Sequence, residues 1–388
     1  MSEVAKANAV ANSVSSKDST DLEKIRVSSS RSIGSLEREI TSVLSHATAV
    51  TALHAAHARG RNHHKFAGQL AANAMRRALN KELPVRAEIV IGEEHSDEVP
   101  TLSAGEQLGP EDAGEEAQLM IAVDPLEGTN LCARGEPGAI TVVAAALKGQ
   151  GEFLRGAQGY FDKIVIGSDL AERVRHMKKR NGPYIYIKVD DERGLIDNPV
   201  EDVIRWIAHV RQKAVSEVVA MVLERERNAE LIARLRALNA QVLLISDGDT
   251  TAGLLALDTK RDVDVALGVG AAPEGVLTAA ICRVFGGYME ARWQLDGSPA
   301  SDAIRADLKT KNIDPEKLLC VEDLASGHIM FSLTGVTYNQ YTPGVQYLAG
   351  GTAVTHTIYG RSRSGTIYER RAIHQNPPPQ PQYPSGDK

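Results

Sequence analysis

The segment Leu119–Thr129 (LMIAVDPLEGT) constrains this chain most strongly, because an apolar run stops abruptly at carboxylates. The apolar residues predict a buried strand that ends at Asp124, where Pro125 removes a backbone donor. Glu127 and Thr129 then add a second carboxylate and a hydroxyl around a turn. In α/β proteins, strand ends of this kind hold metal ions and phosphates. The sequence therefore predicts a metal site here, although acidic residues at strand ends also occur as solvated turn formers.

Apolar runs and amphipathic stretches indicate how the rest of the chain is organised. Helices are expected from about Ser35 to Ala58 and from about Gln69 to Lys81, and residues 101–117 are expected to form a surface loop. Beyond residue 200, strands alternate with helices of about ten residues, which predicts α/β layers. Three further strands are expected near the end, in antiparallel pairs, at Ile329–Leu333, Ala353–Tyr359 and Thr366–Arg371.

The two ends differ in composition from the middle. Residues 1–30 are small, polar and Ser-rich, and residues 375–388 are Pro-rich, so both are predicted to be disordered. The phosphate- and metal-site motifs fall in residues 31–374. Within that region we expect a metal-site half over 31–200 and an alternating α/β half over 201–374.

Charge and cysteine content exclude several classes of protein. The formal net charge of −6 argues against a nucleic-acid partner, because such proteins normally carry a basic stripe. No apolar run reaches membrane-spanning length, and the first residues lack an apolar signal core. Three cysteines, Cys132, Cys282 and Cys320, match no zinc spacing and fit a reducing compartment. We therefore expect a cytoplasmic protein.

Carboxylates follow strands at three other places. Glu93 and Asp97 follow Ala87–Gly92, Asp247 and Asp249 follow Val242–Ile245, and Glu274 follows the strand at Val263–Leu267. Mg²⁺ or Mn²⁺ is commonly held by a few carboxylates together with substrate phosphate. Each set also has a structural interpretation, because acids form solvated turns and, as at Glu274, complement a helix dipole.

Arginine and tyrosine side chains offer a place for a second phosphate. Arg225 and Arg227 follow the strand ending at Leu223, and guanidinium groups bind phosphate oxygens in bidentate fashion. Tyr160 could stack on a substrate or donate a hydrogen bond to it. A solvated helix start and a packed tyrosine are the structural alternatives.

Taken in order, these motifs resemble the class II fructose-1,6-bisphosphatases, which belong to a superfamily of metal-dependent, lithium-sensitive sugar and inositol phosphatases. The resemblance rests on IVIGEEHSDE, AVDPLEGT, SDGD and GVGAAPEGV, and extends through NAMR, YFDKIVIG, MFSLTGVT and GRSRSGTIYERRAIH. It covers roughly residues 35 to 374 in collinear order. It implies a layered α/β sandwich with mixed sheets and hydrolysis of the 1-phosphate of fructose 1,6-bisphosphate. It also implies a homo-oligomer and, from photosynthetic members, sedoheptulose 1,7-bisphosphate as a second substrate.

The resemblance assigns roles residue by residue. It implies metal ligation by Glu93, Asp124, Glu127 and Glu274. It implies catalytic roles for Asp97, Thr129 and Glu127, with Asp97 helping to activate the water. It implies substrate contacts from Glu127, Gly128, Thr129, Tyr160, Arg225, Glu226, Arg227, Asp247, Gly248, Asp249 and Ala271.

One position departs from the family pattern. The family usually carries a metal-ligand Asp shortly before NAMR, and Gly68 stands at that place in NHHKFAGQLAANAMR. His64 stands where the family has Lys. A histidine from this loop or water could complete the coordination, and imidazole would shift the preference toward Mn²⁺ or Zn²⁺. A catalytically impaired paralogue that binds sugar phosphate or a partner protein stays open, as does a phosphatase for another sugar or inositol phosphate.

Overall fold

The structure is a computed structural model of the 388-residue chain. It describes residues 32–93, 101–111, 116–180, 186–190 and 192–383. The chain divides into two compact units, Met1–Glu39 and Ile40–Lys388, and the packing described below lies within the second. The helices are α2 (Ile33–Ala56), α3 (His64–Glu82), α4 (Thr129–Arg134), α5 (Ser168–Arg180), α6 (Val200–Arg211), α7 (Ala229–Ala237), α8 (Asp249–Leu257), α9 (Ala272–Phe285), α10 (Pro299–Thr310) and α11 (Val321–Leu324).

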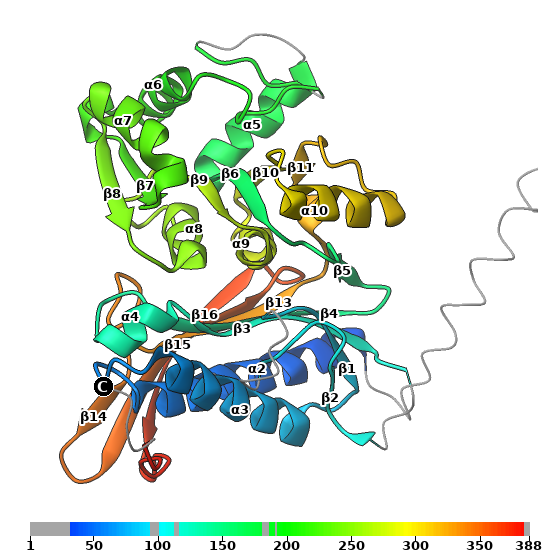
Figure 1. The fold of residues 1–388 in the computed structure, drawn as a ribbon, viewed down its shortest axis with the longest axis vertical. Helices are drawn as coiled ribbons and strands as arrows, with labels where there is room; N and C mark the ends of the chain where they lie inside the picture. The colour runs from blue at the N-terminus through cyan, green and yellow to red at the C-terminus, as the bar shows by residue number, and fades with distance from the viewer. Residues whose placement is uncertain (1–31, 94–100, 112–115, 181–185, 191, 384–388) are drawn as a thin grey trace, which may run out of the picture. The chain divides into compact units, whose positions relative to one another are not determined.

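An eight-stranded sheet carries the predicted metal-site turn (Figure 1). Its strands run in the order β14-β15-β13-β4-β3-β1-β2, and β16 pairs with β15. Among the described strands of this sheet, β1 and β3 are the parallel pair and the other pairs are antiparallel, so the sheet is mixed, as expected. The strands are β1 (Ala87–Ile91), β2 (Gln107–Leu108), β3 (Leu119–Glu127), β4 (Ile140–Leu147), β13 (Met330–Gly335), β14 (Gln346–Leu348), β15 (Thr352–Arg361) and β16 (Thr366–His374).

A six-stranded sheet forms the second layer of strands, in the order β11-β10-β6-β9-β7-β8. It is also mixed, because β7 is parallel to β8 and β9 whereas β6 is antiparallel to β9 and β10. Its strands are β6 (Tyr160–Ile166), β7 (Val219–Leu223), β8 (Gln241–Ile245), β9 (Val265–Ala271), β10 (Tyr288–Trp293) and β11 (Leu319–Cys320). A separate two-stranded sheet pairs β5 (Gly151–Phe153) with β12 (Ala325–Gly327).

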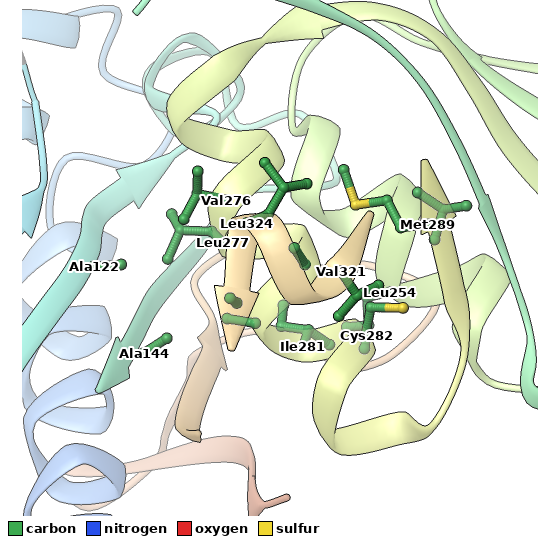
Figure 2. Close-up of a cluster of buried hydrophobic side chains, with 14 of the residues drawn as sticks. Ala122, Ala144, Leu254, Val276, Leu277, Ile281, Cys282, Met289, Val321 and Leu324 are labelled. Carbon is green, nitrogen blue, oxygen red and sulfur yellow. The ribbon is translucent and has the colours of Figure 1, made fainter. Parts of the chain in front are cut away.

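Helix α9 fills the space between the two sheets. Figure 2 shows Ala122 and Ala144 on the first sheet opposite Val276, Leu277 and Ile281 of α9, all within one buried apolar cluster. Alanine at the two strand positions lets the helix approach the sheet closely. Because α9 begins beside the end of β9, this packing brings the first turn of α9 to the ends of the strands.

Buried hydroxyls attach α2 to the other face of the first sheet. Thr48 Oγ1 bonds to Ser332 Oγ at 2.8 Å and accepts from Thr334 Oγ1 at 2.9 Å. Thr141 Oγ1 donates to the Thr48 carbonyl at 3.0 Å. Buried polar groups are costly unless they are bonded, so this network fixes where the helix lies on the sheet.

Several expectations need correction. The strand expected to stop at Asp124 runs on to Glu127, because a register shift between these two residues accommodates Pro125. The region expected to be a loop contains β2, and the second helix begins at His64 rather than near Gln69. Helices α5 and α10 were not anticipated.

The sheets do not follow a division of the chain at residue 200. Strand β6 belongs to the second sheet, and β13 to β16 return to the first.

The described part of the Pro-rich tail makes specific contacts that the sequence did not indicate. His57 Nε2 donates to the Pro378 carbonyl at 3.1 Å, Tyr383 donates to the His57 carbonyl at 2.9 Å, and Arg61 lies 4.2 Å from the Tyr383 ring centroid. Within the described ranges, no helix is both long enough and apolar enough to cross a bilayer.

Candidate active site

The turn at the end of β3 is rigidly built. The Leu126 amide donates to Asp124 Oδ1 at 2.9 Å, and Thr129 Oγ1 donates to the Leu126 carbonyl at 2.8 Å. Gly128 has a φ of 77°, and a Cβ there would lie 3.0 Å from Leu131 Cδ1. A side chain at Gly128 would therefore be strained and crowded, so glycine permits the chain to turn directly into α4.

Glu127 connects this turn to helix α8. Its side chain is 4% exposed, and its Oε1 accepts the Thr250 amide of α8 at 2.6 Å. Its Oε2 is buried and has no hydrogen-bond partner within the described structure. An ionised carboxylate with one unpaired buried oxygen is unfavourable unless a cation approaches it.

A cavity of about 730 Å³ gathers several predicted site residues. Glu93 follows β1, Asp124 lies on β3 and Glu274 lies in the first turn of α9. Tyr160 and Ala271, which start β6 and end β9, line the same cavity. The volume is in the range of small-molecule sites, which is about 300–1,000 Å³.

The carboxylates around this cavity are close enough to disfavour one another's charge. Burial, followed by the neighbouring charges of Glu93 and Glu274, holds the pKa of Asp124 well above its ordinary value. Burial, followed by the charges of Asp124 and Glu274, does the same to the pKa of Glu127. Burial also raises the pKa values of Glu93 and Glu274. A divalent cation would remove this penalty.

The residues present fit a divalent metal ion. Oε2 of both Glu127 and Glu274 is buried without a partner in the described structure, and oxygen donors are what Mg²⁺ and Mn²⁺ require. No three His, Cys, Asp or Glu side chains of the described residues already converge on one point.

Lysine 163 is a site residue that the sequence interpretation missed. Its side chain on β6 is only 4% exposed and forms an ion pair with Asp249, the first residue of α8. Any Cβ at Gly270 would overlap the atoms of this pair, so glycine opens the room for it. A lysine directly before an apolar run (KIVIG) was the available signal, since lysine is rarely buried unless it is paired.

The remaining predicted substrate residues lie nearby. Asp247 and Gly248 line a second cavity of about 410 Å³, and the charge of Asp247 contributes to the raised pKa of Asp124. Arg227 lies over the Tyr160 ring, 4.3 Å from its centroid, and its Nε donates to the Val269 carbonyl at 3.0 Å.

The 3-10 turn after β7 is open to solvent. Arg225 and Glu226 are both exposed there. Burial raises the pKa of Asp247, and the nearby positive charge of Arg225 offsets part of that rise. The turn therefore places a guanidinium group near the carboxylates while leaving it free to contact a ligand. Asp97 lies outside the described residues, so its role stays a prediction.

Gly68 lies in the first turns of α3. A Cβ at this position would have no heavy atom within 4 Å, so the departure from the family pattern leaves open space. The adjacent Ala67 packs in one apolar cluster with Leu126 and Leu131, which flank the metal-site turn. A β-carbon in place of the Gly68 hydrogen would therefore meet no steric obstacle.

Comparison with known proteins gives a consistent result. Residues 38–374 match the family described as "Bacterial fructose-1,6-bisphosphatase, glpX-encoded". A D-fructose 1,6-bisphosphatase class 2/sedoheptulose 1,7-bisphosphatase of a Synechococcus species is 34% identical over 349 residues, which cover 85% of this chain and 94% of that protein. A fructose-1,6-bisphosphatase class 2 of Haemophilus influenzae is 33% identical over 351 residues, 87% of this chain and 97% of its own.

Proposed function

The chain belongs to the family of bacterial fructose-1,6-bisphosphatases, and from this premise we propose that it hydrolyses the 1-phosphate of fructose 1,6-bisphosphate. The products are fructose 6-phosphate and inorganic phosphate. The observation that carries the proposal is the carboxylate cluster with two unpartnered buried oxygens, on Glu127 and Glu274. Such a cluster suits a phosphatase, because a bound cation neutralises the phosphate and stabilises the attacking and leaving oxygens.

Each part of the site has a proposed task. Glu93, Asp124, Glu127 and Glu274 would hold Mg²⁺ or Mn²⁺, which makes a bound water a better nucleophile. Asp97 would accept a proton from the attacking water. The Thr129 oxygen would orient that water by accepting a hydrogen bond from it, since the Thr129 hydroxyl proton is donated to the Leu126 carbonyl.

The substrate is held from the second sheet. Arg225 and Arg227 bind the phosphate that is not cleaved, and Tyr160 packs beside it against Arg227. Asp247 and Asp249 accept hydrogen bonds from sugar hydroxyls. Lys163 fixes the orientation of Asp249 through the buried ion pair.

Phosphate release from fructose 1,6-bisphosphate tests this proposal. Chelator-treated protein is expected to be inactive, and Mg²⁺ or Mn²⁺ is expected to restore the release of one phosphate per substrate molecule. Parallel assays with sedoheptulose 1,7-bisphosphate and inositol phosphates define the substrate range. Absence of phosphate release from folded protein with either metal would refute the activity.

A second candidate function rests on Gly68, which removes the side chain of one family ligand and leaves open space. On that alternative the chain binds sugar phosphate without turning it over. It predicts that fructose 1,6-bisphosphate raises the melting temperature, since a ligand that binds only the folded state stabilises it, while no phosphate appears.

We also propose a cytoplasmic location. All three cysteines are free thiols, two of them buried, which suits a reducing compartment. Cell fractionation against a cytoplasmic marker tests this location.

A further inference from the structure

Strand β16 is an open edge of the first sheet. It pairs along all nine of its residues with β15 on one side. On its other side no strand of the described structure pairs with it. A long edge strand presents a row of unpaired amides and carbonyls, which is a template for pairing with another chain.

Apolar side chains gather on this edge. Ile367 and Ile373 lie on one face of this strand and are 36% and 54% exposed. Tyr368, 41% exposed, points to the other face and stacks on Tyr359 of β15. Single exposed apolar residues are ordinary, but several on one unpaired strand mark a surface suited to burial against a partner.

We propose that β16 pairs with β16 of a second copy of this chain, antiparallel and centred on Arg370. Around a two-fold axis at that residue, Ile367 lies opposite Ile373 of the copy and Glu369 lies opposite Arg371 of the copy. Each pair occurs twice, as an isologous interface requires. Apolar and opposite-charge pairs across antiparallel strands are favourable.

The charges on β16 select this register. Edge charges normally prevent pairing, and moving the centre by one residue would place Glu369 opposite Glu369 or Arg371 opposite Arg371. Only the centre at Arg370 puts each of these charges opposite its complement.

The environment of the three charged side chains agrees with this register. Neither Glu369 nor Arg371 forms a salt bridge among the described residues. The guanidinium of Arg370 itself is directed to α2, where Nη1 donates to Ser45 Oγ at 3.2 Å. The two arginines on the axis are therefore drawn away from each other.

Charge reversal in the full-length chain tests the pairing. Arg371→Glu and Glu369→Arg each place two like-charge pairs across the axis, and each is expected to weaken dimerisation by about tenfold or more at low salt. The double variant Glu369→Arg/Arg371→Glu restores both pairs and serves as the matched control. Sedimentation equilibrium measures the dissociation constants, and circular dichroism verifies that each variant is folded.

Oxidative cross-linking tests the register independently. Opposed Cα atoms in antiparallel strands lie about 4.5–5.5 Å apart, within disulfide range, so Arg370→Cys is expected to form a cross-linked dimer. Thr366→Cys is the control, because its two copies would lie roughly 27 Å apart. A monomeric wild-type chain, a dimer unaffected by Arg371→Glu, a double variant that stays dissociated, or cross-linking at 366 instead of 370 would each overturn the proposal.

Discussion

Two buried acidic regions of this molecule differ in how their charge is balanced. Asp264 is fully buried, and it accepts hydrogen bonds from Arg211, from Lys213 at 3.0 Å and from the Val219 amide at 2.7 Å. In the region around Asp124, Lys163 is the buried cation, and it is paired with Asp249. The first region supplies its own counter-charges, whereas the second leaves buried oxygens unpartnered.

The difference separates a structural role from a functional one. Asp264, a buried carboxylate with internal partners, stabilises the junction of α6, β7 and β9, and its oxygens need no bound cation. In the region around Asp124, burial and neighbouring carboxylates raise the pKa values of Asp124 and Glu127, so the charged forms of these side chains are unfavourable there. Such an arrangement is kept in a folded protein where a bound cation offsets the repulsion between the carboxylates. Buried carboxylates without internal counter-charges therefore identify the metal site better than the number of acidic residues does.

The largest expected effect is at Asp124. Asp124→Asn is expected to lower kcat by roughly a thousandfold or more, because it removes a ligand to the cation that stabilises the reaction. The melting temperature of the metal-free variant should match or exceed that of the wild type, since one of several repelling charges is gone. A large loss of metal-free stability would contradict the contrast with Asp264.

Asp264→Asn should show the reverse pattern. Removing one partner of a buried ion network is expected to cost about 3 kcal/mol of the free energy of unfolding, because Lys213 and Arg211 lose a charged partner. Urea unfolding measures that loss. Activity of the folded fraction should stay near the wild-type value, and a selective loss of kcat would show that the two regions are not distinct.

Lys163→Met tests the buried cation that pairs with Asp249. Without the ion pair, Asp249 loses its fixed orientation, and the KM for fructose 1,6-bisphosphate is expected to rise by about thirtyfold with a smaller change in kcat. Steady-state kinetics at saturating metal separates the two constants. An unchanged KM would argue that Asp249 does not contact the substrate.

Gly68→Asp should give the smallest effect. The β-carbon of the new residue enters open space, and its carboxylate is expected to tighten Mn²⁺ binding by about tenfold. Gly68→Asn has nearly the same shape without the charge and is the control. Equal metal affinities in both variants and the wild type would mean that another residue or water already completes the coordination.

The sequence was informative where local chemistry decides structure. The turn after β3 and the carboxylates at other strand ends could be located from apolar runs interrupted by Asp, Glu, Pro and Gly. The mixed sheets followed from the resemblance, and the alternating helices and strands after residue 200 were recognisable from their spacing.

What could not be predicted depends on partners distant in the sequence. The pair of Lys163 and Asp249 joins residues 86 positions apart and needs the space at Gly270. Strand β3 continues past Pro125 because its neighbours tolerate a register shift, which no local rule reveals. The contacts of the tail with His57 and the open edge at β16 are likewise products of topology.

Metal titration monitored by calorimetry tests the central claim most directly. Mn²⁺ added to chelator-treated wild-type protein and to Asp264→Asn should bind with similar affinity, whereas Asp124→Asn should bind at least tenfold more weakly. If Asp124→Asn binds Mn²⁺ as tightly as the wild type, the uncompensated carboxylates are not the metal site and the account fails.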